Sequence, residues 1–345
     1  MPDPALTLLL FFLIAAVLLA LFTPQHGLVA RWRQQRRLTQ RVRIEDALKH
    51  LHHCESENRR PTLQSLAGAL QITADRAAEI LERLSNHELV QPQDGSFGLT
   101  PDGREYALRV IRAHRLWERY LADETGFEAQ SWHSQAEEQE HRLSLEEIDA
   151  LSAQLGHPLH DPHGDPIPTA AGELAPPQGR PLPEMPPDTR AVITHLEDEP
   201  ETIYAQLLAE GLFTGMEIRL LENTPRRVRF WSNGDEHRLA PLLARNITVV
   251  AVPETASESP AGRPLSTLQP GEAARVLAIS PGVRGAERRR LLDLGILPGT
   301  DIAAELRSPG GDPTAYLVRG ALIALRAEQA RLIRVTDPEI NRYER

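Results

Sequence analysis

The most apolar stretch of the chain lies near its N-terminal end. Residues 5–22 form an uncharged run of 18 residues, ALTLLLFFLIAAVLLALF, which is long enough to cross a bilayer as a helix. A cleavable signal peptide would have a basic start and a small-residue cleavage site. Here Asp3 precedes the run and Leu21-Phe22-Thr23 closes it. The pattern therefore predicts an uncleaved transmembrane anchor over residues 1–24.

Arginines follow this run directly, in a basic juxtamembrane segment over residues 25–43 (Arg31, Arg33, Arg36, Arg37, Arg41 and Arg43). Positive flanks stay on the cytoplasmic side of a membrane. We therefore expect a single-pass protein of the inner (cytoplasmic) membrane with the bulk of the chain in the cytoplasm. The same arginines could serve as a DNA-binding arm, but lipid headgroups are the favoured counter-charge beside a transmembrane helix.

The next hydrophobic pattern has helical periodicity. Residues 44–60 are amphipathic, and two helices separated by a brief turn follow at 63–70 and 74–87, the second with Thr73 as its N-cap. Asp94-Gly95 between two short extended runs then indicates a hairpin. Helix, turn, helix and hairpin are typical of a winged helix-turn-helix, which we place at residues 44–108.

Three more helices are expected at 101–125, 131–141 and 144–155, before a Pro- and Gly-rich loop and linker at 158–187. An internal repeat follows, because LLAEGLFTGMEI at 207–218 matches LLDLGILPGTDI at 291–302. Each copy has one short helix and several short strands. The repeat predicts two small β-barrels joined by a linker.

Composition limits the chemistry that the chain can perform. The single cysteine, Cys54, excludes an internal disulfide and a thiolate metal cage. The formal net charge of −10 argues against a basic nucleic-acid binder as a whole. No nucleophile elbow, P-loop or paired catalytic acid and base is present, so we do not expect an enzyme.

One group of residues has the pattern of a metal site. His114 and Glu118 are four apart on one predicted helix and so share a face. The next helix carries a second set at spacings of four, three and one: His133, Glu137, Glu140 and His141. Imidazole and carboxylate from two packed helices suit Mn(II) or Fe(II), while Zn(II) or Co(II) compete on affinity. The alternative is a charged, solvated helix face.

These residues carry a resemblance to a known family. The run from His114 to Leu121, Trp132-His133 with Glu137-x-x-Glu140-His141, and the segment from His157 to Pro168 resemble the metal-binding and dimerisation domain of the diphtheria-toxin-repressor and manganese-transport-regulator family. The C-terminal repeats resemble its SH3-like domains, which also stand alone as FeoA, a small partner of the ferrous-iron transporter. The resemblance implies a homodimer in which a divalent metal, Mn(II) or Fe(II), controls DNA binding.

The expected domains follow in order along the chain. After the anchor, the basic segment and the winged helix come the metal-binding and dimerisation domain (109–172), a linker (173–187), the first SH3-like FeoA-type domain (188–253), a second linker (254–264), the second such domain (265–336) and a tail (337–345). The fold class is thus multidomain: a transmembrane helix, a helical region with a winged helix-turn-helix, and two small β-barrels.

Two metal positions are implied by the resemblance. The primary position would use Asp46 with Glu137, Glu140 and His141, and would clamp the winged helix to the dimerisation helices. The ancillary position would use His114, Glu118 and His133. In some members a carboxylate and an amide from the SH3-like domain complete it; here Glu197, Asp198, Glu199 and Glu201 lie near that point, and no Gln falls at the amide position. Lys49 stands where some manganese-binding members have a glutamate, so one metal is expected at the primary position.

DNA would be read by the helix that starts at Ala74, which offers Arg76 and Arg83. Residues 61–107 contain three basic side chains and seven acidic ones. Phosphate contacts supply most of the affinity for DNA, so this surface is unusually acidic for a DNA reader. The sequence therefore predicts a membrane-anchored, metal-dependent transcriptional regulator. The alternative is a membrane-bound metal sensor that acts on a ferrous-iron transporter through its FeoA-like domains, without DNA binding.

Overall fold

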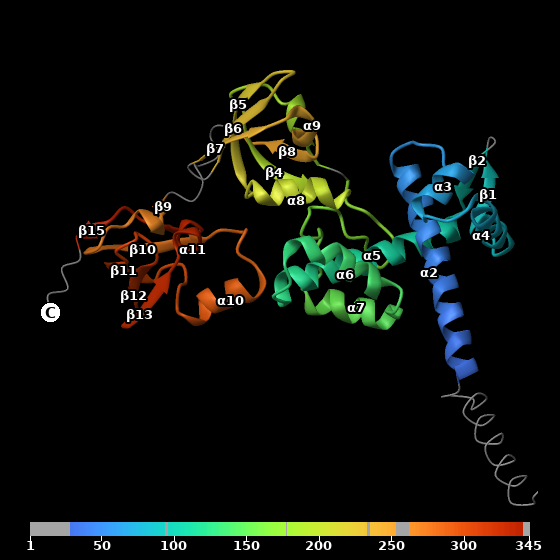
Figure 1. Cartoon of the computed structure of the whole chain (residues 1–345), viewed down its shortest axis with the longest axis horizontal. Helices are drawn as coiled ribbons and strands as arrows, with labels where there is room; N and C mark the ends of the chain where they lie inside the picture. The colour runs from blue at the N-terminus through green and yellow to red at the C-terminus, as the bar shows by residue number, and fades with distance from the viewer. Residues whose placement is uncertain (1–27, 94–95, 177, 233–234, 253–261, 341–345) are drawn as a thin grey trace, which may run out of the picture. The chain divides into compact units, whose positions relative to one another are not determined.

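The computed structural model of the chain describes residues 28–93, 96–176, 178–232, 235–252 and 262–340 (Figure 1). These residues form two compact units. The first contains the chain up to Arg112, together with residues 140–143 and 170–172. The second contains the remaining helices and two β-sheets.

The first unit consists of helices and one hairpin: α2 (Leu28–Ser56), α3 (Leu63–Ala69), α4 (Ala74–Asn86), β1 (Val90–Gln93), β2 (Ser96–Leu99) and the beginning of α5 (Pro101–Glu124). At the start of α3, Thr62 and Ser65 each accept a hydrogen bond from the other's backbone N–H. Thr73 caps α4 in the expected way, accepting from the Arg76 N–H. Such caps satisfy amides that a helix leaves unpaired, and they bring the apolar faces of the helices into one core that includes Leu48, Leu66 and Leu84.

Helix α2 is longer than the hydrophobic pattern predicted. It begins at Leu28 instead of residue 44 and ends at Ser56, so residues 28–43 of the basic segment are helical. This stretch contains no Gly or Pro and is rich in Arg and Gln, which are good helix formers. It lacks the apolar periodicity on which the prediction depended, because its helical propensity comes from residues that are mostly polar.

The predicted membrane location is contradicted. Within the residues that the structure describes, no helix is both long enough and apolar enough to cross a bilayer. The 29-residue α2 carries arginines along its first half. The apolar run at residues 5–22, on which the anchor prediction depended, lies outside the described residues. The single-pass inner-membrane assignment is therefore wrong on this finding.

The second unit begins with the C-terminal half of α5. A 3₁₀ turn η1 (Ala129–Ser131) leads into α6 (Trp132–Glu140), and α7 (Leu145–Gln154) follows. Ser144 and Glu147 form a capping box at the start of α7. The chain then turns through residues 156–169, where His160 and Pro166 form an isolated bridge.

Two antiparallel sheets with the same strand order complete this unit. The first runs β3-β8-β4-β5-β6-β7, and the second runs β9-β14-β10-β11-β12-β13 with β15 added beside β10. Each strand of the first sheet has a counterpart in the second sheet whose strand number is higher by six, so that β3 corresponds to β9 and β8 to β14. One helix lies at the same point of each copy, α8 (Glu201–Ala209) and α10 (Gly285–Asp293), and so does a shorter one, α9 (Pro241–Ala244) and α11 (Ala327–Arg331). The sequence repeat therefore corresponds to two domains with the same strand and helix topology.

The strands of the first sheet are β3 (Arg180–Pro181), β4 (Arg190–Leu196), β5 (Glu217–Asn223), β6 (Val228–Ser232), β7 (Asp235–Leu239) and β8 (Ile247–Ala251). Those of the second are β9 (Arg263–Pro264), β10 (Glu272–Ile279), β11 (Asp301–Arg307), β12 (Thr314–Val318), β13 (Ala321–Leu325), β14 (Ile333–Val335) and β15 (Glu339–Ile340). The prediction of a helical N-terminal region followed by sheet-rich C-terminal domains is confirmed.

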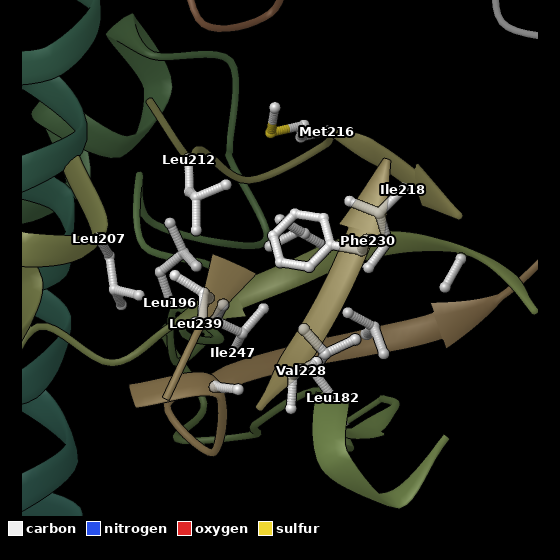
Figure 2. Packing of buried hydrophobic residues seen from close by; sticks show 14 of the residues in the cluster. Leu182, Leu196, Leu207, Leu212, Met216, Ile218, Val228, Phe230, Leu239 and Ile247 are labelled. Carbon is white, nitrogen blue, oxygen red and sulfur yellow. The ribbon is translucent and has the colours of Figure 1, made fainter. Parts of the chain in front are cut away.

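Alternation along the strands builds the core of each sheet. In β6 the burial pattern alternates, so that Val228 and Phe230 point inward and Trp231 is 47% exposed. Figure 2 shows Phe230 among Leu212, Met216 and Ile218 in the middle of this core. The first leucine of the repeated Leu-Leu-x-x-Gly motif and the residue after its glycine, Leu207 and Leu212, are both fully buried in this core and anchor the end of α8 on the sheet.

We expect Phe230→Ala to destabilise the first sheet by about 3–5 kcal/mol, because it removes a fully buried ring and leaves a cavity. Trp231→Ala, which truncates the neighbouring half-exposed ring, is the matched control and should cost about 1 kcal/mol or less. Urea unfolding followed by circular dichroism measures both. Equal effects of the two substitutions would contradict the placement of the core.

Candidate metal centre

Helices α5 and α6 bring three predicted ligands together. His114 and Glu118 lie one turn apart on α5, and their Nε2 and Oε1 atoms are 3.0 Å apart. His133, in the first turn of α6, places its Nδ1 3.2 Å from His114 Nε2 and 3.3 Å from Glu118 Oε1. All three side chains are largely buried, and that of Glu118 is 1% exposed. The structure thus assembles the predicted ancillary group, here called the α5–α6 cluster.

Two residues that were not assigned as ligands complete this cluster. Asp198 Oδ2 lies 3.1 Å from His133 Nδ1. His163 Nε2 lies 3.6 Å from Glu118 Oε1 and 3.9 Å from Asp198 Oδ2. The His163 side chain is 1% exposed, and neither ring nitrogen makes a hydrogen bond to any residue that the structure describes. A buried imidazole directed at two carboxylates in this way needs a further partner.

The loop that carries His163 is held in one conformation. Asp161 Oδ1 accepts hydrogen bonds from the backbone N–H groups of His163, Gly164 and Asp165, each 2.9 Å long. The His163 carbonyl accepts from the N–H of Leu196, the last residue of β4. Gly164 has a φ of 103° and passes so close to β4 that a Cβ would lie 2.0 Å from the Thr194 carbonyl oxygen. The loop therefore fixes His163 beside the segment after β4 that carries Asp198.

Charge in the α5–α6 cluster is strongly coupled. Burial opposes ionisation of Glu118, but the neighbouring His114, His133 and His163 outweigh it and hold the pKa of Glu118 well below its usual range. Burial alone would lower the pKa of His133 and His163. The carboxylates of Asp198 and Glu118 raise the pKa of His133, and Glu118 with Asp161 raises that of His163 to about 9. Without a metal, the cluster therefore balances buried carboxylates with protonated imidazoles.

A second group lies in the first unit, where α2 faces the end of α6. His141 Nε2 is 3.2 Å from Asp46 Oδ1 and 3.3 Å from Glu140 Oε1. Its Nδ1 lies 2.6 Å from Glu45 Oε2. This carboxylate fixes the ring as an outer partner does for a metal-bound histidine, since it takes the Nδ1–H and leaves Nε2 for an ion. Three of the four predicted primary ligands thus converge.

The fourth predicted primary ligand, Glu137, lies one turn before Glu140 on α6, and its Oε1 is 3.6 Å from His133 Nε2. Lys49, on α2, directs its ammonium at Glu140, with Nζ 2.8 and 3.0 Å from the two carboxylate oxygens. The Glu140 side chain is fully buried. Helical spacing placed Lys49 near Asp46, but its contact with Glu140 depends on tertiary packing.

Both groups fit a transition-metal ion by the chemistry of their donors. Ligand atoms bound at about 2.1 Å and at right angles lie about 3 Å apart, which is the spacing among His114, Glu118 and His133. In each group the donor atoms lie within 4.8 Å of one another. The donors are imidazole nitrogens and carboxylate oxygens, and no thiolate is among them. Such sets suit Mn(II), Fe(II) and Zn(II).

Comparison with known proteins gives the site a context. A model described as "Iron dependent repressor, metal binding and dimerisation domain" matches residues 100–169, which contain the whole α5–α6 pair. A model of the FeoA domain matches residues 263–337, the second sheet. The diphtheria toxin repressor of Corynebacterium glutamicum is 29% identical over 217 residues, which cover 59% of this chain and 94% of that protein.

Over these segments the chain is similar to the diphtheria toxin repressor family and, at its C-terminal end, to the FeoA domain. A solved relative, "Manganese-dependent transcriptional repressor complex with manganese", superposes with a TM-score of 0.56 at 27% identity, over 61% of this chain and all of that one. A "Probable metal transport system membrane protein" of Chlamydia trachomatis is 41% identical over 80 residues. The chain spans only 18% of that protein's length.

The predicted DNA-reading residues lie on α4. Arg76 and Arg83 are both exposed, and Arg76 Nη1 lies 3.2 Å from Glu79 Oε2 on the same helix. Part of the positive charge that α4 could offer to phosphate is therefore compensated locally.

We expect metal binding to release protons near neutral pH. Burial lowers the pKa of His141, but Asp46 and Glu45 outweigh it and raise that pKa to about 9, as Glu118 does for His163. These imidazoles are protonated at pH 7, and an ion binds only the neutral form. Mn(II) affinity should therefore increase from pH 6 to pH 8. Calorimetry in two buffers of different ionisation enthalpy should give at least one proton released per ion, and a pH-independent affinity would contradict this.

Proposed function

We propose that this chain is a dimeric, DNA-binding transcriptional regulator that responds to Mn(II) or Fe(II). The observation that supports this most directly is the convergence of His114, Glu118 and His133 inside a segment that matches the metal-binding and dimerisation domain of iron-dependent repressors. The solved relative with a TM-score of 0.56 is a manganese-dependent repressor with manganese bound. A non-enzymatic role agrees with the printed names of these relatives, which are repressors.

The ancillary metal would be held by His114, Glu118 and His133, joined by Asp198 and His163. Three imidazoles and two carboxylates would then form its coordination sphere. Asp198 follows β4 of the first sheet, whereas His114 and Glu118 lie on α5. This ion would therefore tie the first sheet to the dimerisation helices, which is a structural role.

The primary metal would be held by Asp46, Glu140 and His141, with Glu137 as the fourth ligand one turn earlier on α6. Asp46 belongs to α2, the first helix of the winged-helix region, while Glu140 ends α6. An ion at this position would hold the DNA-reading helix in a fixed register within the dimer. Metal binding and DNA binding would then be coupled. A winged-helix region that the metal has already ordered loses less conformational entropy when it binds DNA.

The alternative function inferred from the sequence, a membrane-bound sensor acting on a ferrous-iron transporter, depended on the membrane location that the structure contradicts. We do not retain it. The FeoA domain at residues 263–337 remains as a second sheet of the same topology, without an assigned ligand.

Glu118→Gln should remove one tightly bound Mn(II) per chain, because it replaces the carboxylate at the centre of the α5–α6 cluster with a neutral amide. Glu140→Gln should remove the other, and the double variant should bind none tightly. Glu105→Gln, which alters a 71% exposed carboxylate on the same helix α5, is the matched control. Equilibrium dialysis with metal analysis gives the count. Unchanged stoichiometry in both single variants would refute the ligand assignment.

Mn(II)-loaded full chain should select operator-sized fragments from genomic DNA, and a chelator should weaken that binding at least tenfold. Arg83→Ala should reduce the affinity several-fold, because it removes an exposed cation from α4. Arg238→Ala changes an arginine that is also exposed but lies on the first sheet, so it should have no effect. Failure to retain any fragment in the presence of Mn(II) would count against DNA binding.

A further inference from the structure

Lys49 is the only lysine in the chain, in which the other 37 basic side chains are all arginine. It lies on α2, three residues after Asp46 and four after Glu45, so the three side chains share one face of the helix. Its ammonium contacts both oxygens of Glu140, at 2.8 and 3.0 Å. The single lysine of the protein is thus inside the proposed primary metal site.

The ammonium and a metal ion would compete for the same atoms. Glu140 Oε1, which accepts from Lys49 Nζ at 2.8 Å, is also the oxygen that lies 3.3 Å from His141 Nε2. An ion held by His141, Asp46 and Glu140 would be coordinated by that same oxygen. The two positive charges would then be only a few ångströms apart, where they repel strongly because the surroundings are partly desolvated.

A lysine side chain is better suited than an arginine to release Glu140 when a metal ion binds. An arginine would grip a carboxylate with a rigid, bidentate fork, whereas lysine carries a compact charge on a flexible stem. The Lys49 side chain is 24% exposed while that of Glu140 is fully buried. The ammonium therefore has a path to solvent, and the carboxylate does not. In the absence of metal, the ammonium of Lys49 neutralises the negative charge of the buried Glu140 carboxylate, as a buried charge requires.

We propose that Lys49 is an intrinsic cation of the primary site, which holds Glu140 in the absence of metal, must leave it when metal binds, and limits the site to one divalent ion. This inference rests on the proposed function, since it assumes that metal binds at Asp46, Glu140 and His141. Lys49 then determines the metal concentration at which the site fills. It also keeps α2 joined to the Glu140–His141 segment in the metal-free protein.

The test uses the full chain carrying Glu118→Gln, so that only the primary site is titrated with Mn(II). Lys49→Gln keeps a hydrogen-bond donor for Glu140 but removes the charge, and should bind Mn(II) at least tenfold more tightly. Lys49→Arg keeps the charge and should stay within threefold of the parent or bind more weakly. Lys49→Glu should bind two Mn(II) ions at this site in place of one. Equal or weaker binding by Lys49→Gln would overturn the proposal.

A second measurement needs no substitution at Lys49. Because Lys49 carries the only ε-amine in the chain, its acetylation by an activated ester can be followed by peptide mass spectrometry. Adding Mn(II) should accelerate the reaction several-fold in the Glu118→Gln protein, and should not do so when Glu140→Gln is added. An unchanged rate on metal binding would overturn the proposal. If Glu140→Gln leaves Mn(II) affinity unchanged, the primary site itself is wrongly assigned, and the proposed function fails at that point instead.

Discussion

Buried carboxylates need positive charge beside them, and the described part of this protein meets that need in two ways. Glu118 is 1% exposed and is surrounded by His114, His133 and His163. Glu140 is fully buried and holds the ammonium of Lys49. A carboxylate removed from water without such a partner would protonate or destabilise the fold. Protons on imidazole in one cluster and a lysine in the other therefore stand where metal ions would bind.

This constraint connects the site to the architecture. His114 and Glu118 come from α5 and His133 from α6, while Asp198 comes from the segment that follows β4 of the first sheet. The Asp161 turn and the close passage of Gly164 along β4 hold the loop that adds His163. Each cluster therefore draws on segments far apart in the chain. Replacing its protons or its lysine by a metal changes the strength of links between elements, which is what a metal-responsive regulator requires.

Much of the fold was predictable because its signals are local. Thr62, Thr73 and Ser144 cap helices within a residue or two of their expected starts, and the repeated Leu-Leu-x-x-Gly motif anticipated two sheets that share one topology. The start of α2 was missed because residues 28–43 are helical without an apolar stripe. The membrane location was inferred from residues 5–22, and the described residues contain no helix that could span a bilayer.

The site was predictable only in part. Spacings of three and four on a helix were enough to group His114 with Glu118 and Glu140 with His141, because helical geometry is local. His163 stood in a segment that resembled the family but had no assigned role, and Asp198 was one of several nearby acidic residues. Glu45 and the contact of Lys49 with Glu140 depend on packing between segments about ninety residues apart. No pattern in the sequence specifies such contacts.

The most direct test of this account is anomalous X-ray diffraction from crystals of the full chain grown with Mn(II). We expect two manganese peaks per chain, one among His114, Glu118, His133 and Asp198 and one among Asp46, Glu140 and His141. Lys49 should have moved away from Glu140 in the same crystal. Manganese bound only at exposed carboxylates, or a primary-site ion with Lys49 still on Glu140, would contradict it.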